Sequence, residues 1–305
     1  MKKNLPVTIL LIILIFICAS CAPVVRRTSG ETITGRDGKE VSVPASLSRI
    51  ISMGPSNTEI LAALGLSGSF VAVDTYSGGF EGVKDGIAFL DMMNPDAERM
   101  VALAPDLILV TGMMQIAGED PLQSVSDAGV CVVYIPTSNS ISDIKKDIEF
   151  IGKLTRTEQA AQNLVKKMDT AIDEIETIGK TIAVKKTVYF EISPAPYLYS
   201  FGTGVFLNEM IELIGAENVF GGVESWISVQ EEVLVASNPD VILTVTDYID
   251  DPVGEIMSRS GWGVITAVKN ADVYFIETNA ATLPNHNIVT ALKQMAEAVY
   301  PDKYK

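Results

Sequence analysis

The chain contains two stretches in which short apolar runs alternate with helical segments. Between residues 46 and 140 these runs are RIISM, FVAVD, IAFLD, DLILVT and VCVVYI, and after residue 181 they are TVYFEIS, VILTVT and DVYFIE. Short apolar runs separated by helices are typical of parallel strands that are covered on both faces. The pattern predicts two α/β lobes with central, mostly parallel sheets, at 46–140 and 181–305.

A segment with helical periodicity, residues 141–180, separates the predicted lobes. Apolar residues that recur every three or four positions lie on one face of its second half: Ala161, Leu164, Val165, Met168, Ile172, Ile175 and Ile178. Thr155 and Glu158 have the spacing of a capping box, and Gly179 marks the helix end. A helix of about 22 residues is about 33 Å long. We expect this single long helix to join the two lobes.

Two short patterns occur once in each predicted lobe, in the same order. The first is a helix from a glutamate to a glycine, EILAALG from Glu59 and EMIELIG from Glu209. The second is a helix, a Pro-Asp turn and a strand, in which Glu98, Ala102, Pro105, Asp106, Ile108 and Leu109 match Glu232, Ala236, Pro239, Asp240, Ile242 and Leu243. Such pieces also arise by chance, but their shared order favours two related lobes. The copies are too far apart for a solenoid repeat.

The amino terminus has the parts of a secretory signal. A Lys-Lys pair precedes an uninterrupted apolar run, and Ala19 and Ser20 provide small residues before Cys21. The run is too short for a stable membrane span, so residues 1–20 are expected to be removed. The ending resembles that of a bacterial lipoprotein signal, which implies lipidation of Cys21. Ordinary cleavage that leaves a free Cys21 is the alternative.

The mature chain is strongly acidic. The full chain has a formal charge of −15, and the loss of Lys2 and Lys3 gives the mature chain a charge of −17. Neither nucleic acid nor an anionic lipid surface is therefore an expected electrostatic partner. Membrane contact is expected through the lipid anchor. Residues 21–45 are predicted to be a polar tether with an N-terminal β-hairpin. Cys131 is predicted to be a buried strand residue, because its neighbours are apolar and form no redox or metal motif.

Four segments carry a specific resemblance: RIISMGPSNTEILAALGL, NPDAERMVALAPDLILV, FLNEMIELIGAENVF and SWISVQEEVLVASNPDVIL. They resemble the substrate-binding proteins of ABC importers for ferric siderophores, haem and cobalamin, and the likeness covers nearly all of residues 35–300. It implies two α/β lobes joined by one rigid helix, with the ligand cleft between them. It also implies a monomeric, extracytoplasmic protein without enzymatic activity. Such a protein captures an iron chelate, haem or corrinoid and delivers it to a permease dimer with ATPase subunits.

The resemblance assigns a docking role to two of the repeated glutamates. One exposed glutamate on each lobe pairs with arginines of the permease in this family, and Glu98 and Glu232 occupy the matching positions. Two carboxylates on related surfaces suit a two-fold symmetric partner, because arginine binds carboxylate through two parallel hydrogen bonds. The helix dipole also favours a glutamate in the first turn, and Glu231 is an adjacent candidate for the second position.

Candidate ligand contacts follow the predicted strands, because parallel α/β lobes bind ligands beyond the carboxyl ends of their strands. We predict contacts from Tyr76, Met92, Met93, Met113, Met114, Tyr197, Tyr199, Trp226, Tyr248, Asn279 and His286. The loops that carry them contain no lysine or arginine, which a strongly anionic chelate usually requires. They suit a large, flat or weakly charged ligand, such as a corrinoid, haem or a neutral hydroxamate complex.

Haem needs ligands for its iron. The resemblance points to Met93, which precedes the NPD turn, whereas the partner histidine of haem-binding relatives is replaced here by Asp247 and Tyr248. Tyrosine also ligates ferric haem, so Met93 and Tyr248 are the candidate iron ligands if haem is carried. The protein is expected to hold no metal or cofactor of its own. A single histidine, His286, is too few for a zinc or manganese receptor.

A membrane-anchored hydrolase on a two-lobe α/β scaffold is the alternative function. The chain contains no G-x-S-x-G, H-E-x-x-H or P-loop motif, although catalytic carboxylates need no such motif. The signal is compatible with either the periplasm or the outer face of the plasma membrane, and in both cases places the anchor on the outer side of the cytoplasmic membrane.

Overall fold

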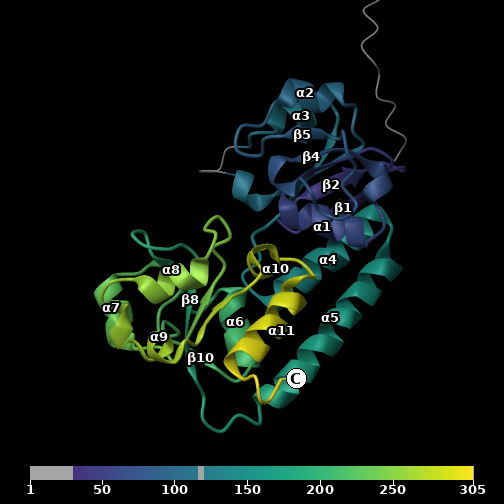
Figure 1. Cartoon of the computed structure of the whole chain (residues 1–305). Coiled ribbons are helices and arrows are strands. Elements are labelled where there is room, and N and C mark those ends of the chain that lie inside the picture. Colours follow the sequence, from purple (N-terminus) through teal and green to yellow (C-terminus); the bar gives the residue numbers. More distant parts are fainter. Residues whose placement is uncertain (1–29, 116–119, 305) are drawn as a thin grey trace, which may run out of the picture.

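The computed structural model describes residues 30–115 and 120–304 and contains two α/β lobes, stacked one above the other in Figure 1. Each lobe is built around a parallel sheet. The chain passes from the upper lobe to the lower one through α4 (Ile141–Thr155) and α5 (Glu158–Gly179). The prediction of two α/β lobes with parallel sheets is confirmed. The predicted signal peptide and Cys21 lie outside the described residues.

The N-terminal lobe contains a five-stranded sheet in which every neighbouring pair is parallel. Its strands, in spatial order, are β5 (Ala88–Leu90), β4 (Phe70–Asp74), β3 (Ile50–Met53), β6 (Leu107–Thr111) and β7 (Cys131–Ile135). Its helices are α1 (Pro55–Ala63), α2 (Ala97–Ala102) and α3 (Gln123–Asp127). The antiparallel hairpin of β1 (Glu31–Thr34) and β2 (Glu40–Val43) packs against β7 and buries Ile33 and Val43 in the core of the lobe.

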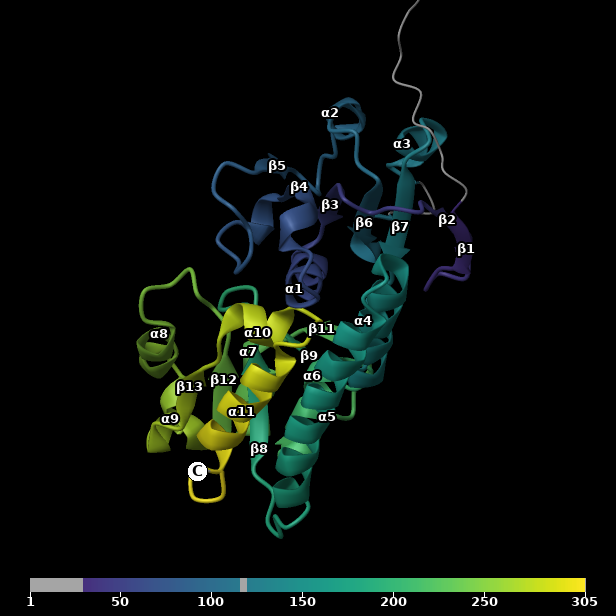
Figure 2. The ribbon, with the colours of Figure 1, turned by 90° about the vertical axis from the view of Figure 1, so that its right-hand side faces the viewer.

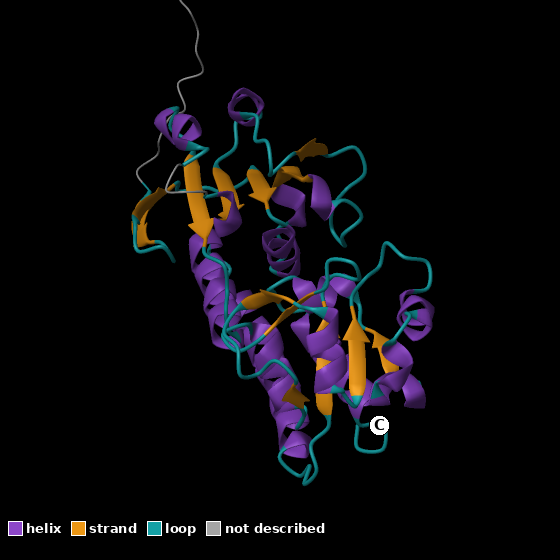
Figure 3. Cartoon of the chain, turned by 90° about the vertical axis from the view of Figure 1, so that its left-hand side faces the viewer, coloured by secondary structure: helices purple, strands orange, loops and turns teal. Residues whose placement is uncertain are grey.

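The C-terminal lobe repeats this plan with fewer strands. Its parallel sheet has the order β10 (Glu217–Asn218), β8 (Thr187–Glu191), β12 (Val241–Thr244) and β13 (Val273–Phe275). A separate antiparallel ribbon consists of β9 (Tyr199–Phe201) and β11 (Trp226–Ser228). Helices flank the strands of each lobe (Figure 3). Those of this lobe are α6 (Phe206–Leu213), α7 (Glu231–Ser237), α8 (Pro252–Ser258), α9 (Thr266–Asn270), α10 (Thr278–Thr282) and α11 (Ile288–Val299).

The repeated Pro-Asp pairs have the same structural role in both lobes. Asp106, before β6, accepts hydrogen bonds through Oδ2 from the N–H groups of Ser48 (2.8 Å) and Arg49 (2.9 Å), which precede the neighbouring β3. Asp240, before β12, accepts through Oδ2 from the N–H (2.8 Å) and hydroxyl (2.9 Å) of Thr187, the first residue of the neighbouring β8. Each aspartate therefore aligns two adjacent parallel strands, which supports two related lobes over a chance match.

One hydrophobic core runs through both lobes. Successive residues of a strand face opposite sides of a sheet, and alternate residues of β6 and β12 face this shared core: Leu107, Leu109, Val241 and Leu243. Helices α4, α5, α6 and α11 supply the side chains between the sheets, including Ile144, Ile148, Ile151, Met168, Ile172, Ile211, Leu292 and Met295. The other face of each sheet has a core of its own, around Met100 in one lobe and Trp262 in the other.

Helices α4 and α5 form an antiparallel hairpin along one side of the molecule, with one face in the shared core, and they lie side by side in Figure 2. Lys145 of α4 pairs with Asp169 of α5. At the closed end a Cβ on Gly152 would lie 2.4 Å from that of Ala161, so glycine permits the close approach of the helices. From there α5 continues past α4 and packs against α6 and α11 of the other lobe.

The capping box predicted at the start of the long helix is wrong. Thr155 is the last residue of α4, and its Oγ1 donates to the carbonyl of Ile151 (2.7 Å). The residue before α5 is Thr157, which makes no side-chain capping hydrogen bond. Arg156, in the left-handed conformation with φ of 60°, makes the turn between the helices. The turn between the two closely packed helices is short, and α5 begins directly after it without a side-chain cap.

Two of the repeated glutamates bond outside their own lobes, and Glu59 joins the two lobes directly. Glu59 of α1 accepts hydrogen bonds from the side-chain amides of Asn285 (2.5 Å) and Asn287 (3.0 Å), and Asn287 immediately precedes α11. Glu209 of α6 accepts from the N–H of Ile141, the first residue of α4 (3.0 Å). Each carboxylate thus lies at the amino-terminal end of a helix outside its own lobe, where the helix dipole favours negative charge.

We expect the contribution of Glu59 and Glu209 to stability to increase as the pH falls toward 4.5, the ordinary pKa of a glutamate side chain. Burial raises the pKa of Glu59 and Glu209 above the ordinary value of 4.5, so the folded protein takes up these protons before the unfolded chain does. The free energy of unfolding therefore rises as the pH falls through the folded pKa values. Burial raises the pKa of Asp74 and Asp147 with the same sign. Chemical denaturation at a series of pH values measures this slope.

The double variant Glu59→Gln with Glu209→Gln tests the cause, because glutamine does not titrate. Its slope of stability against pH is expected to be shallower than that of the wild type. Glu174→Gln, on the exposed face of α5, is the matched control and should leave the slope unchanged. A double variant with the wild-type slope would show that the interlobe glutamates do not contribute.

Candidate functional site

A cavity of about 310 Å³ lies at the carboxyl ends of the N-terminal strands. Residues 54–57, which follow β3, and residues 135–138, at the end of β7, form two of its walls. Its opposite wall is the segment 282–284, which connects α10 to α11 in the other lobe. The cavity therefore lies between the lobes, at the edge of the sheet where parallel α/β folds bind ligands.

Four of the predicted contact residues line this cavity: Tyr76, Met92, Met93 and Met113. Tyr76, Met93 and Met113 are 62%, 71% and 69% exposed and form its rim, whereas Met92 is buried. Met114, also buried, joins the other three methionines around an adjoining hollow of about 260 Å³. Methionine side chains adapt to irregular apolar surfaces, so this rim is suited to a flat apolar ligand.

The remaining aromatic and amide candidates do not line this cavity. Tyr197, Tyr248 and Asn279 are exposed on the C-terminal lobe. Trp226 stacks on Tyr199, with ring centroids 6.1 Å apart and parallel planes, because β11 pairs with β9. Their contact with a ligand stays a prediction. Iron ligation by Met93 and Tyr248 also stays a prediction.

His286 lies in a different hollow, of about 340 Å³, together with Glu59 and Glu81. Burial lowers the pKa of His286, so its imidazole is neutral at neutral pH, and its buried Nδ1 makes no hydrogen bond. Among residues 30–115 and 120–304, no three His, Cys, Asp or Glu side chains are grouped to hold a metal ion. The structure thus places His286 beside the interlobe contact rather than in the cavity.

The loop between β3 and α1 also contributes to the cavity, and the sequence analysis overlooked it. Gly54 has a φ of 156°, and a Cβ there would lie 3.1 Å from Cβ of Thr111, so glycine lets α1 begin close to β6. The side chain of Asn57 is only 3% exposed, and its amide Nδ2 has no hydrogen-bond partner. This loop also follows a strand, so the tendency of ligands to bind beyond strand ends could have identified it. It contains no aromatic or methionine side chain, and the sequence prediction relied on these residue types.

Two buried carboxylates flank the cavity. Asp147 lines it and accepts hydrogen bonds from Nε of Arg36 and Oγ of Ser138, both at 2.5 Å. Asp74 lies next to the start of α1 and accepts from the N–H of Gly54 (3.2 Å). Burial raises the pKa of both aspartates. No described residue that lines the cavity is a lysine or arginine, and the charged residue that does line it, Asp147, is paired with Arg36.

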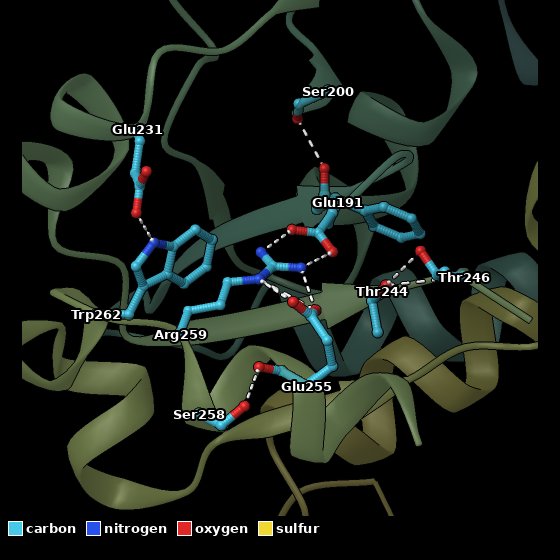
Figure 4. Close-up of polar contacts among 10 residues, drawn as sticks. Glu191, Ser200, Glu231, Thr244, Thr246, Glu255, Ser258, Arg259 and Trp262 are labelled. Carbon is cyan, nitrogen blue, oxygen red and sulfur yellow. Dashed lines mark hydrogen bonds and ion pairs between the residues drawn. The ribbon is translucent and has the colours of Figure 1, made fainter. Parts of the chain in front are cut away.

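A buried cation in the C-terminal lobe was also missed by the sequence analysis. Arg259 lies between the carboxylates of Glu191, at the end of β8, and Glu255, on α8 (Figure 4). It donates to Glu191 through two nitrogens, at 2.6 and 3.0 Å, and to Glu255 through Nε at 2.9 Å. Burial alone would lower the pKa of Arg259, but these hydrogen bonds raise it. Two carboxylates therefore neutralise the cation, and it is not free to attract an anionic ligand.

The same cluster continues to the surface of the C-terminal lobe. The guanidinium of Arg259 lies 4.4 Å from the ring centroid of buried Trp262, and Nε1 of Trp262 donates to Glu231 at 2.6 Å (Figure 4). Glu231 and its neighbour Glu232 occupy the first turn of α7, and Glu98 occupies the first turn of α2. All three glutamates are exposed. Glu231 is thus already bonded within the protein.

The described helices give no sign of a membrane span, since none of them is both long and apolar enough to cross a bilayer.

Comparison with known proteins places this arrangement among transport proteins. Residues 50–280 match the family described as periplasmic binding protein. An uncharacterized ABC transporter substrate-binding lipoprotein of Bacillus subtilis, YvrC, is 34% identical over 276 residues, which cover 90% of this chain and 87% of that protein. A vitamin B12-binding protein of Vibrio vulnificus is 26% identical over 259 residues, which cover 83% of this chain and 90% of that protein.

A solved structure shares both the fold and the sequence pattern. A possible iron-binding (periplasmic solute-binding) protein from Staphylococcus epidermidis matches with a TM-score of 0.74 and 33% identity, covering 83% of this chain and 99% of that chain. These relatives confirm the resemblance expected from the sequence and the expectation of a binding protein rather than an enzyme. The chain belongs to the periplasmic binding protein family.

Proposed function

We propose that this protein captures a flat, weakly charged metal chelate of the corrinoid class and delivers it to the permease of an ABC importer. The observation that carries the proposal is the character of the interlobe cavity. Methionine, tyrosine and uncharged polar groups line it together with Asp147, and none of the described lining residues is a lysine or arginine. Relatives named as an ABC transporter substrate-binding lipoprotein and as a vitamin B12-binding protein support the same assignment.

The size of the cavity determines how such a ligand can bind. Its volume of about 310 Å³ is at the lower end of the range for small-molecule sites, about 300–1,000 Å³. A corrin ring is therefore expected to lie across the mouth, against the exposed side chains of Tyr76, Met93 and Met113. Tyr197 and Tyr248, exposed on the other lobe, are proposed to cover its second face.

Charge argues against the other chelates of the class. An anionic ferric catecholate or citrate complex requires unpaired cations, and Arg259 is already neutralised by Glu191 and Glu255. Haem presents carboxylates, which also call for unpaired cations, and Arg36 beside the cavity is already paired with Asp147. A corrinoid or a neutral hydroxamate complex avoids these penalties, and the relative that binds vitamin B12 favours the corrinoid.

Delivery is proposed to use Glu98 and Glu232. Helices α2 and α7 each precede the second strand of the repeated pair, β6 and β12, so the two carboxylates occupy equivalent places in the two lobes. Because Glu231 accepts a hydrogen bond from Trp262, Glu232 is the freer partner for a permease arginine. Lipidation of Cys21, outside the described residues, is proposed to hold the monomer at the outer face of the cytoplasmic membrane.

The ligand assignment is tested by native mass spectrometry of residues 22–305 with cobalamin, haemin and ferric hydroxamate, catecholate and citrate complexes. Cobalamin is expected to be retained selectively, because the cavity offers apolar and uncharged contacts. Selective retention of catecholate or citrate would contradict the charge argument while leaving a transport role. If none of these chelates is retained, the assignment to metal chelates fails.

Charge reversal tests the docking surface. Glu98→Arg together with Glu232→Arg is expected to weaken permease binding by at least about tenfold, because attraction to permease arginines becomes repulsion. Ligand affinity should not change, since both residues lie outside the cavity. Surface plasmon resonance on the reconstituted permease measures the effect. The control is Glu174→Arg with Glu158→Arg on the exposed face of α5, which changes the net charge by the same amount. Wild-type binding by the doubly reversed variant would exclude this docking surface.

A further inference from the structure

We propose that Asp74 is a positioning residue of the interlobe cavity. Asp74 is not among the residues that line the cavity, but its carboxylate bonds to two segments that do, and it thereby fixes where Tyr76 and the start of α1 meet the ligand. The inference rests on the proposed function, which places the ligand in this cavity. It adds the buried residue that holds the cavity wall in its binding geometry.

Three hydrogen-bond donors from two loops converge on this carboxylate. Asp74 is the last residue of β4 and is fully buried. Its Oδ2 accepts from the N–H of Gly54 (3.2 Å), in the loop between β3 and α1. In the turn that follows β4, the N–H of Tyr76 donates to Oδ1 (2.8 Å) and the hydroxyl of Ser77 donates to Oδ2. Because Gly54 and Tyr76 both line the cavity, a single side chain joins two parts of its wall.

A chain of buried hydroxyl groups extends this connection to α1 and β3. Oγ of Ser77 lies 2.8 Å from Oγ1 of Thr58, on α1. Oγ1 of Thr58 in turn lies 2.8 Å from Oγ of Ser52, on β3. All three residues are fully buried. The turn that carries Tyr76 is therefore held from inside the lobe, by groups that do not contact the cavity.

The contacts of Asp74 indicate why this position needs a carboxylate. A buried carboxylate costs free energy unless it is paired or hydrogen-bonded. Within residues 30–115 and 120–304, Asp74 forms no ion pair, and the groups that bond to it are uncharged donors. Two carboxylate oxygens can accept from all three donors, whereas asparagine has one acceptor oxygen and an NH₂ group that would face another donor. An asparagine at this position would therefore leave a buried donor without its acceptor.

A cavity wall that is fixed in advance favours ligand binding. A loop that is ordered before the ligand arrives loses less conformational freedom on binding, and preorganisation increases affinity for this reason. The side chain of Tyr76 is largely exposed at the rim of the cavity, so its position depends mainly on the backbone of the turn. The hydrogen bond from the N–H of Tyr76 to Asp74 fixes that backbone.

The test compares Asp74→Asn with Asp106→Asn. Asp106 is the matched control because it also accepts from two backbone N–H groups and one hydroxyl, those of Ser48 and Arg49, but at the amino ends of the strands, outside the cavity. Chemical denaturation is expected to show a loss of stability in both variants. Isothermal titration calorimetry with cyanocobalamin is expected to show about tenfold weaker binding by Asp74→Asn and unchanged binding by Asp106→Asn.

A double-mutant cycle with Tyr76→Ala measures whether Asp74 acts through the turn. Tyr76→Ala should itself weaken binding, and adding Asp74→Asn should then cost less affinity than it does in the wild type, because the side chain that Asp74 positions is already absent. Ser77→Ala is a milder variant, which removes one donor and the connection to Thr58 but leaves both N–H bonds to Asp74. It should weaken binding by about threefold.

Wild-type affinity of a folded Asp74→Asn, or equal losses of affinity in Asp74→Asn and Asp106→Asn, would overturn the proposal, because the carboxylate would then have a structural role alone. Fully additive losses in the cycle with Tyr76→Ala would overturn it as well. If Asp74→Asn does not fold, wild-type binding by Ser77→Ala has the same meaning. A wild type that binds no cyanocobalamin would contradict the proposed function, and this inference with it.

Discussion

The two lobes share one hydrophobic core, which fixes how their sheets lie relative to each other. Each parallel sheet turns one face toward it, and the hairpin of α4 and α5 fills the space between them. Protein interiors are close-packed, so a large rotation of one lobe against the other would open voids in this core. The lobes therefore hold a nearly fixed separation, and the interlobe cavity is formed by the fold rather than by closure around a ligand.

The repeat within the sequence follows from this arrangement. Asp106 and Asp240 align equivalent strand pairs within each lobe, whereas Glu59 and Glu209 connect each lobe to a helix outside it. The aspartates stabilise the sheets. The glutamates add hydrogen bonds to the apolar contacts of the shared core. Because both glutamates are partly buried, the connection between the lobes responds to pH as well as to packing.

The interlobe cavity and the proposed docking surface at Glu98 and Glu232 differ in their electrostatics. Around the cavity, buried carboxylates either bond to backbone, as Asp74 does, or neutralise a cation, as Asp147 does with Arg36. At Glu98 and Glu232 the carboxylates are exposed and available to a basic partner. The charge distribution thus agrees with both proposals: the described lining of the cavity has no free cation, and the exposed carboxylates could pair with a basic partner.

The two lobes, the 22-residue α5 and the paired motifs could be predicted from the sequence, because apolar periodicity and Pro-Asp turns act locally. It also predicted Tyr76, Met92, Met93 and Met113 at one cavity, since all of them follow strands of one sheet. Three features could not be predicted in this way: the amide nitrogen of Asn57 has no partner, His286 lines another hollow, and Arg259 is neutralised by Glu191. These outcomes depend on contacts between segments far apart in the chain, which the packing of sheets and lobes brings together and local sequence patterns do not encode.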